Sequence, residues 1–171
     1  ACTGYFGLLA ARAAPAAEIV CFEPHLANFA RLELNLALND ARNVRAMRAA
    51  VARADDVAAL RVYSQNDVLT PGAVLPDEGR PLIRSEDVKT VSIDSFLMAQ
   101  GKAPPGLVRI DVDTNAVEII AGMAQTLAAA SPDLLIGMRD AGRAQQLEHE
   151  LSQHGYRFYA IDEDNGSIVA A

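Results

Sequence analysis

Glu18-Ile19-Val20-Cys21-Phe22-Glu23-Pro24 is the stretch that decides the fold of this chain. Its four central residues are apolar and begin with two β-branched side chains, which favours a buried parallel strand over residues 19–22. Pro24 is a good first residue for the helix that should follow. The carboxylate of Glu23 is therefore expected at the carboxyl end of a strand, where ligands of open α/β sheets bind.

The carboxylate of Glu23 has two interpretations. An ionised carboxylate can accept hydrogen bonds from two adjacent hydroxyls, which is what a nucleotide-like ribose requires. A short glycine-containing turn, Thr3-Gly4-Tyr5, lies about twenty residues upstream, which is the turn-to-acid separation of a Rossmann-type half. Alternatively, Glu23 only favours a helix N-terminus, where negative charge is stabilised, and Gly4 is only a tight turn. The first interpretation makes Thr3, Gly4, Tyr5 and Glu23 the predicted cofactor-binding residues.

Helices and strands are expected to alternate along the rest of the chain. Helices are predicted over residues 5–12 with Thr3 as the cap, over 24–38, from Asp94 to Gly101, behind a capping-box pattern at 115–118, and from Asp140 to Gly155. Strands are predicted over residues 43–51, 60–63, 88–93, 107–112 and 134–136, with a closing hairpin of 156–161 and 167–169. The strands on either side of a Pro/Gly-rich loop, residues 70–86, predict an antiparallel excursion. The alternation predicts a single α/β domain over residues 1–171, with a doubly wound, mostly parallel sheet and an antiparallel end strand.

The composition excludes several classes of function. The chain of 171 residues is 51% hydrophobic and 22% charged, which is typical of a globular domain. Its net charge of −7 argues against a nucleic-acid partner or an anionic membrane surface. No apolar run approaches the ~20 residues that span a bilayer. Cys2 and Cys21 form neither a disulfide framework nor a metal-ligand pattern, so we expect a reducing, cytoplasmic location and no metal site.

A second acidic motif follows the apolar run of residues 107–110. Asp111 and Asp113 end this predicted strand, where Asp111 could hold an acceptor hydroxyl or act as a base. Alternatively, Asp111 only caps the next helix. His25, just after Pro24, is near enough to contact a ligand, but the favoured interpretation is a solvated side chain in the first turn of its helix. There is no Ser-His-Asp order and no His-x-x-x-His spacing, so neither a hydrolase nor a metalloenzyme is supported.

The order of these motifs resembles the FkbM-type family of S-adenosylmethionine-dependent methyltransferases. The resemblance rests on residues 1–10, Phe22-Glu23-Pro24, 34–39 with 43–44, 91–97, 110–113 and 155–159. It covers almost the whole chain. The family implies a Rossmann-like methyltransferase sheet and methyl transfer from S-adenosylmethionine, usually to a hydroxyl of a sugar or small natural product. By position, Gly4 and its neighbours would line the methionine part of the cofactor, Glu23 would bind the ribose hydroxyls, and Asp111 would face the methyl group or the acceptor.

Three departures from the family pattern limit this expectation. The family's cofactor motif begins with Asp-x-Gly at the end of a first, central strand, and this chain opens just after that glycine would fall. We therefore expect an incomplete fragment or an upstream segment, with the central strand missing from this sequence. Where the family has the motif Asp-x-Glu-Gly-x-Glu, this chain has Asp111-Val112-Asp113-Thr114-Asn115-Ala116. Where the family commonly has a glutamate at the end of the fifth strand, this chain has Gly137.

Three functional hypotheses follow from these observations. The first is an active O-methyltransferase acting on a small-molecule or glycan acceptor, with Asp111 as the catalytic residue. The second is a methyltransferase-like binding or structural domain without turnover, which the altered motif at 113–116 and Gly137 favour. The third, a nicotinamide-dependent Rossmann enzyme, needs a Gly-x-Gly-x-x-Gly turn that Gly4 and Gly7 supply only in part.

Overall fold

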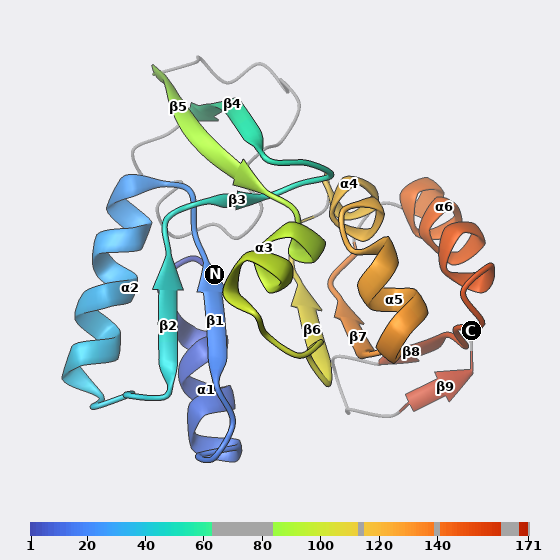
Figure 1. The fold of residues 1–171 in the computed structure, drawn as a ribbon, viewed down its shortest axis with the longest axis horizontal. Helices are drawn as coiled ribbons and strands as arrows, with labels where there is room; N and C mark the ends of the chain where they lie inside the picture. Colours follow the sequence, from blue (N-terminus) through green and yellow to red (C-terminus); the bar gives the residue numbers. More distant parts are fainter. Residues whose placement is uncertain (63–83, 113–114, 139–140, 162–167, 171) are drawn as a thin grey trace.

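Helices and strands alternate in the structure as the sequence predicts (Figure 1). The structure is a computed structural model that describes residues 1–62, 84–112, 115–138, 141–161 and 168–170. The elements in chain order are α1 (Tyr5–Ala13), β1 (Ile19–Phe22), α2 (Leu26–Leu38), β2 (Val44–Met47), β3 (Ala50–Val51), β4 (Asp56–Val62), β5 (Arg84–Val91), α3 (Ile93–Gln100), β6 (Leu107–Ile110), α4 (Ala116–Ala121), α5 (Ala124–Ala130), β7 (Asp133–Ile136), α6 (Ala141–Ser152), β8 (Tyr159–Ile161) and β9 (Ile168–Ala170).

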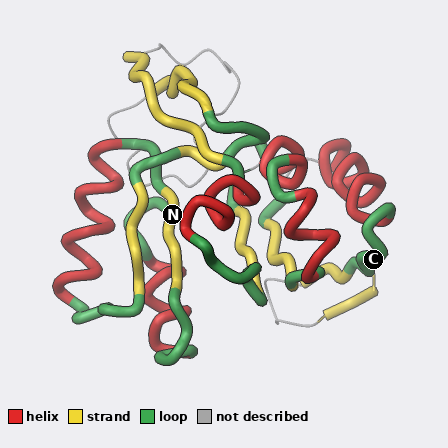
Figure 2. The backbone as a smooth tube through the Cα atoms, viewed as in Figure 1, coloured by secondary structure: helices red, strands yellow, loops and turns green. Residues whose placement is uncertain are grey.

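Two parallel strand pairs form the centre of the fold (Figure 2). β1 pairs with β2, with Ile19 opposite Val44, and β6 pairs with β7, with Leu107 opposite Asp133. Within the described residues, β1 and β6 each have one strand partner. Phe22 of β1 packs against the core cluster that contains residues of β6, α4 and α6. The two pairs therefore share one core, and the prediction of an α/β fold with mostly parallel strands is confirmed.

The antiparallel parts of the prediction are also present. β4 runs antiparallel to β5 along its length, while β3 adds to β5 in parallel, which confirms the predicted excursion. β8 and β9 form the antiparallel hairpin near the C-terminus; the turn predicted for it at residues 164–166 lies outside the described residues.

The predicted single strand over residues 43–51 is wrong. The amide of Ala49 donates to the carbonyl of Met47 at 3.0 Å, and this tight turn ends β2 so that β3 can join a different sheet.

Hydrophobic residues bury β1 on both faces. Cys21 forms one cluster with Leu32 and Leu36 of α2, whereas its neighbour Phe22 packs against the other cluster. Successive side chains of a strand point to opposite faces, so helices must cover both sides of β1. The second cluster contains Ile93, Ile110, Ala116, Ile119, Ile120, Met123, Leu127, Leu147 and Leu151. Leu147 and Leu151 are buried as predicted.

Local geometry corrects two helix boundaries. Gly4, not Thr3, is the N-cap residue of α1, with a φ of 92° and no side-chain cap; the carbonyl of Thr3 accepts a hydrogen bond from Asn35 instead. α2 begins at Leu26 rather than Pro24, because His25 holds an extended conformation (φ −74°, ψ 123°) as its N-cap.

The predicted helix after residue 115 is two helices, α4 and α5. The carboxylate of Asp94 accepts hydrogen bonds from the amides of Gln125 and Thr126, each at 2.9 Å. These amides belong to the first turn of α5, where a helix lacks internal acceptors. A carboxylate 31 positions upstream therefore starts a new helix at this point. Asp140, the predicted cap of α6, lies outside the described residues. No helix in the described part of the chain is long and apolar enough to cross a membrane.

Candidate functional site

The carboxylate of Glu23 lies at the carboxyl end of β1 and is only 6% exposed. Oε2 accepts hydrogen bonds from the amide of Cys2 at 2.6 Å and from the amino group of Ala1 at 3.2 Å. Oε1 accepts from the amide of His25 at 3.0 Å and from Asn28 Nδ2 at 3.4 Å. Two backbone amides therefore hold the carboxylate at short distances, and two longer contacts complete its shell. Glu23 organises the junction between the N-terminal segment and the start of α2.

The predicted cofactor turn lies beside Glu23. The amide of Gly4 donates to the carbonyl of Ala1 at 3.0 Å, which closes the turn over the carboxylate. A Cβ at Gly4 would lie 2.6 Å from Leu32 Cδ1, so only glycine fits this positive-φ position against α2. Thr3, Gly4 and Glu23 are thus brought together as the sequence predicts. Tyr5 is 64% exposed, and its ring meets that of Phe6 edge-on at 5.1 Å.

Asp111 follows β6 and is paired with a cation. Arg109 Nη1 donates to Asp111 Oδ2 at 3.0 Å, and the side chains are 28% and 36% exposed. The Arg109 guanidinium carbon lies 3.2 Å from the centre of the Phe6 ring, a cation–π contact that links β6 to the first turn of α1. Because Phe6 follows the Gly4 turn, this contact connects the Arg109–Asp111 pair to that turn. Asp113 lies outside the described residues.

Gly137 has a specific steric role beside Asp111. A Cβ at Gly137 would lie 2.6 Å from Asp111 Oδ1, well inside normal contact distance. The amide of Gly137 donates to the carbonyl of Ile110 at 2.8 Å, which extends the β6–β7 pairing up to Asp111. The missing side chain at position 137 therefore leaves the space into which Oδ1 of Asp111 points.

The predicted solvated position of His25 is wrong, because His25 is 7% exposed. Arg84 Nη2 lies 3.1 Å from His25 Nε2, and Glu86 Oε1 lies 3.5 Å from the same nitrogen. Both residues belong to β5, about sixty positions away in sequence. Arg84 and Glu86 are two residues apart on one strand, so they share a face, but nothing in the sequence indicates that this face covers His25.

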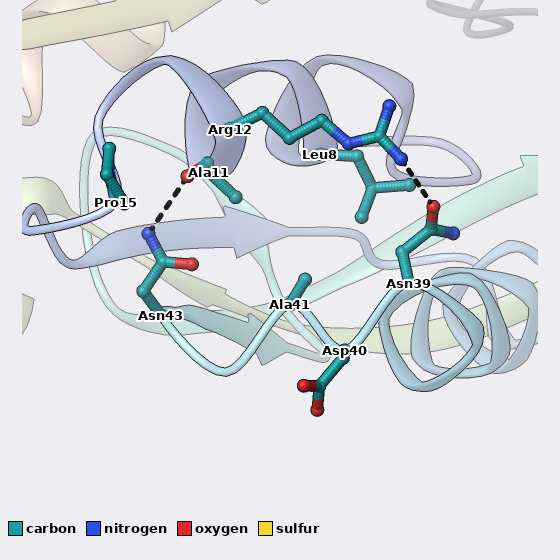
Figure 3. Close-up of a pocket in the computed structure, with 8 residues that line it drawn as sticks. All are labelled: Leu8, Ala11, Arg12, Pro15, Asn39, Asp40, Ala41 and Asn43. Carbon is teal, nitrogen blue, oxygen red and sulfur yellow. Dashed lines mark hydrogen bonds between the residues drawn. The ribbon is translucent and has the colours of Figure 1, made fainter.

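A small pocket lies at the opposite end of β1 and β2, where α1 and α2 end (Figure 3). Its volume is about 200 Å³, and it is lined by Leu8, Ala11, Arg12, Pro15, Asn39, Asp40, Ala41 and Asn43. Asn43 Nδ2 donates to three carbonyls that follow or end α1, at 3.1–3.4 Å, and Arg12 donates to Asn39 Oδ1 at 3.0 Å. The Asn43 side chain thus provides hydrogen-bond donors for backbone carbonyls at and after the end of α1. We therefore interpret the pocket as a feature of the packing of the fold.

The perturbed carboxyls of the described residues stabilise the fold outside the candidate site. The Ser95 hydroxyl and the Ser92 amide, which donates at 2.8 Å, hold the pKa of Asp55 below its ordinary value. A side-chain hydrogen bond from Arg53 likewise holds the pKa of Glu118 below its ordinary value. Within the described residues, no group of three or more His, Cys, Asp or Glu side chains could hold a metal ion.

Comparisons with known proteins agree with this geometry. The chain matches the methyltransferase FkbM domain over residues 1–158. It is similar in structure to the crystal structure of methyltransferase FkbM from Methylobacillus flagellatus KT, with a TM-score of 0.60 and 14% sequence identity. That match covers 93% of this chain and 38% of the other, so the chain spans well under half the length of that protein. A search of curated proteins gives no significant match. The chain belongs to the family defined by the methyltransferase FkbM domain.

Proposed function

We propose that the protein is an S-adenosylmethionine-dependent methyltransferase that methylates a hydroxyl oxygen of a sugar or small natural product. Family membership supports methyl transfer. The observation that carries the cofactor assignment is the oriented carboxylate of Glu23, held by the amides of Cys2 and His25 beside the Gly4 turn. A carboxylate fixed by two backbone amides at a strand end is suited to accept hydrogen bonds from a ribose diol.

The donor set around Glu23 fits this cofactor. A carboxylate has about four lone-pair sites, and the two short amide bonds use one on each oxygen. The contacts from Ala1 at 3.2 Å and Asn28 at 3.4 Å are the longer ones, and ribose hydroxyls can replace them. Because the side chain is 8% exposed, ribose binding requires these longer contacts to open. Thr3, Gly4 and Tyr5 would line the methionine part, as the family resemblance implies.

Asp111 is the residue that we assign to the acceptor. S-adenosylmethionine supplies the methyl group, and the chain's own residues then have mainly to position the acceptor oxygen. Arg109 occupies Oδ2 of Asp111, whereas Oδ1 points into the space beside Gly137. Oδ1 is therefore the oxygen that would accept a hydrogen bond from the acceptor hydroxyl and orient its lone pair toward the methyl group.

The finer features of the fold and the setting are part of this proposal. We infer a doubly wound, Rossmann-like sheet in which a further strand lies between β1 and β6. The single strand partners of β1 and β6 among the described residues support this arrangement. The 61% exposure of Leu107 and the 39% exposure of Leu135 on the β6–β7 pair support it further. A small-molecule or glycan acceptor and a cytoplasmic location complete the proposal, with neither a nucleic acid nor a membrane as partner.

Calorimetric titration of the full-length protein, with the proposed strand between β1 and β6 in place, tests the proposal, with S-adenosylmethionine as the ligand and NAD as the comparison. We expect saturable binding of S-adenosylmethionine and none of NAD. No binding of S-adenosylmethionine would overturn the methyltransferase assignment, and binding of NAD in its place would favour a nicotinamide-dependent enzyme. Binding without methyl transfer to a panel of hydroxylated acceptors would favour the binding domain.

A further inference from the structure

Four charged or polar side chains converge beside the N-terminus of α2, next to the Glu23 site. His25 is the N-cap of α2, Arg48 lies between β2 and β3, and Arg84 and Glu86 belong to β5. Glu86 Oε1 lies 3.3 Å from Arg84 Nη2 and 3.5 Å from His25 Nε2, and its Oε2 lies 3.9 Å from Arg48 Nη2. Since His25 follows β1 and Arg48 follows β2, this cluster lies at the carboxyl ends of these parallel strands, where ligands of such sheets bind.

The charges of the cluster do not balance. The cations are the guanidiniums of Arg48 and Arg84, whose side chains are 45% and 53% exposed, and the anion is Glu86, which is 20% exposed. The cluster therefore carries an excess of one positive charge in a chain whose net charge is −7. A guanidinium presents five N–H donors in a planar fork that matches the oxygens of carboxylate and phosphate groups. Glu86 already shows that an oxyanion fits between the two guanidiniums.

His25 gives an independent indication of a ligand. Its side chain is 10% exposed, and a guanidinium can only donate, so Nε2 accepts from Arg84 and the ring proton lies on Nδ1. Within the described residues, Nδ1 of His25, which then carries the ring proton, has no hydrogen-bond partner. α2 also has no side-chain cap. Buried polar groups without partners are rare in folded proteins and call for an explanation.

We propose that Arg48 and Arg84, beside His25, form a binding site for an oxyanion group, a carboxylate or a phosphate, and that Glu86 occupies the site until the ligand displaces it. The assignment of this group to the methyl acceptor rests on the proposed function. The neighbouring carboxylate of Glu23 does not oppose an anion here, because the amides of Cys2 and His25 already donate to it. On that assignment, the site would select acceptors that carry a negative group in addition to the hydroxyl to be methylated.

Titration of the protein with inorganic phosphate and, separately, with acetate tests the proposal, at constant ionic strength and followed by ¹H–¹⁵N NMR. We expect saturable shifts at His25, Arg48 and Arg84 with at least one of the two anions; the stronger binder identifies the group. Arg84→Gln should weaken binding at least about tenfold, since a hydrogen bond to a charged group contributes about 1.5–3 kcal/mol. Glu86→Gln should tighten binding several-fold, because it removes the internal competitor.

The opposite signs of these two variants separate a binding site from a structural ion pair. Arg61→Gln, on the neighbouring strand β4, is the matched control and should leave anion binding unchanged. If Arg84→Gln does not fold, Arg48→Gln provides the same test, because its single weak contact at 3.9 Å adds little to the fold. Absence of saturable shifts, or a Glu86→Gln variant that binds no more tightly than wild type, would overturn the proposal.

S-adenosylmethionine titrated into samples of the full-length protein distinguishes this inference from the proposed function. Anion binding at the cluster without S-adenosylmethionine binding supports the oxyanion site and overturns the methyltransferase assignment. S-adenosylmethionine binding without anion binding overturns the oxyanion site alone.

Discussion

Replacing Glu23 separates its role in organising the N-terminal segment from its proposed role in binding ribose. Glu23→Ala removes the acceptor of the amides of Cys2 and His25. The His25 amide is trapped at the start of α2, and hydrogen bonds to charged groups contribute about 1.5–3 kcal/mol each. The Cys2 amide can regain water if its segment detaches, so it should lose less. We expect the free energy of unfolding to fall by about 2–4 kcal/mol in Glu23→Ala.

Glu23→Gln keeps an acceptor oxygen for one amide and removes only the charge. Its free energy of unfolding should fall by about 1–2 kcal/mol, which leaves a folded protein for binding studies. If ribose hydroxyls depend on the carboxylate, the affinity for S-adenosylmethionine should fall by about 10- to 150-fold, which corresponds to 1.5–3 kcal/mol. Guanidinium unfolding followed by circular dichroism measures the first quantity, and calorimetric titration measures the second.

Glu33→Gln is the matched control for both measurements. Glu33 is an exposed carboxylate on α2, so its replacement should change neither stability nor affinity. A loss of less than about 0.5 kcal/mol in Glu23→Ala, within the range of ordinary surface substitutions, would refute the organising role. A folded Glu23→Gln variant that binds S-adenosylmethionine as tightly as wild type would refute the ribose role.

Three further predictions concern stability, pH and thiol reactivity. Gly122→Ala would place a Cβ 2.2 Å from a backbone carbonyl oxygen just after β3, whereas Gly106→Ala meets nothing within 4 Å; guanidinium unfolding should show a loss of about 1–3 kcal/mol for the first alone, and equal stability of the two would contradict the packing. Because the pKa of Asp55 is lowered chiefly by the Ser95 hydroxyl, its contribution to stability is present above the unfolded-state value and disappears as pH falls through the folded value. Ser95→Ala should therefore destabilise the protein at about pH 7, and the difference from wild type should shrink as the pH falls below the unfolded-state pKa of Asp55; a difference that stays constant as the pH falls would count against the assignment. Burial raises the pKa of the Cys21 thiol, so alkylation by iodoacetamide, followed by mass spectrometry, should be at least about tenfold slower than in urea-unfolded protein; equal rates would show that the thiol is accessible.

The parts of the fold that depend on local sequence were predictable. The strand over residues 19–22 matches β1 residue for residue, because an uninterrupted apolar run followed by proline leaves few alternatives. The cluster of Cys21, Leu32 and Leu36 likewise follows from the helical spacing of α2. These features need only the periodicity of side chains along one element.

The features that depend on distant segments were not predictable. The break between α4 and α5 follows from Asp94, which caps α5 from the start of α3. The burial of His25 follows from Arg84 and Glu86 of β5. In each case the partner lies 30 to 60 positions away, and no periodicity along one element carries that information. The same limit applies to the predicted starts of α1 and α2, which were wrong. The N-cap residues of these helices depend on how the backbone of the N-terminal segment and of His25 is arranged around the Glu23 carboxylate.

The acceptor side shows most clearly how structure changes an interpretation made from sequence. Gly137 stands where the family commonly has a glutamate, and the sequence alone suggested a lost carboxylate. The structure shows that a side chain at this position would collide with Oδ1 of Asp111. A carboxylate at position 137 and the observed orientation of Asp111 therefore exclude each other in this chain. The absence of a side chain at position 137 thus allows the observed orientation of Asp111. Arg109 donates to Oδ2 of Asp111 and stacks on Phe6, and it thereby fixes the Asp111 carboxylate in place. Gly137 is consequently weaker evidence for a degenerate domain than its sequence suggests, because one acidic group is retained in a defined position beside the cofactor turn.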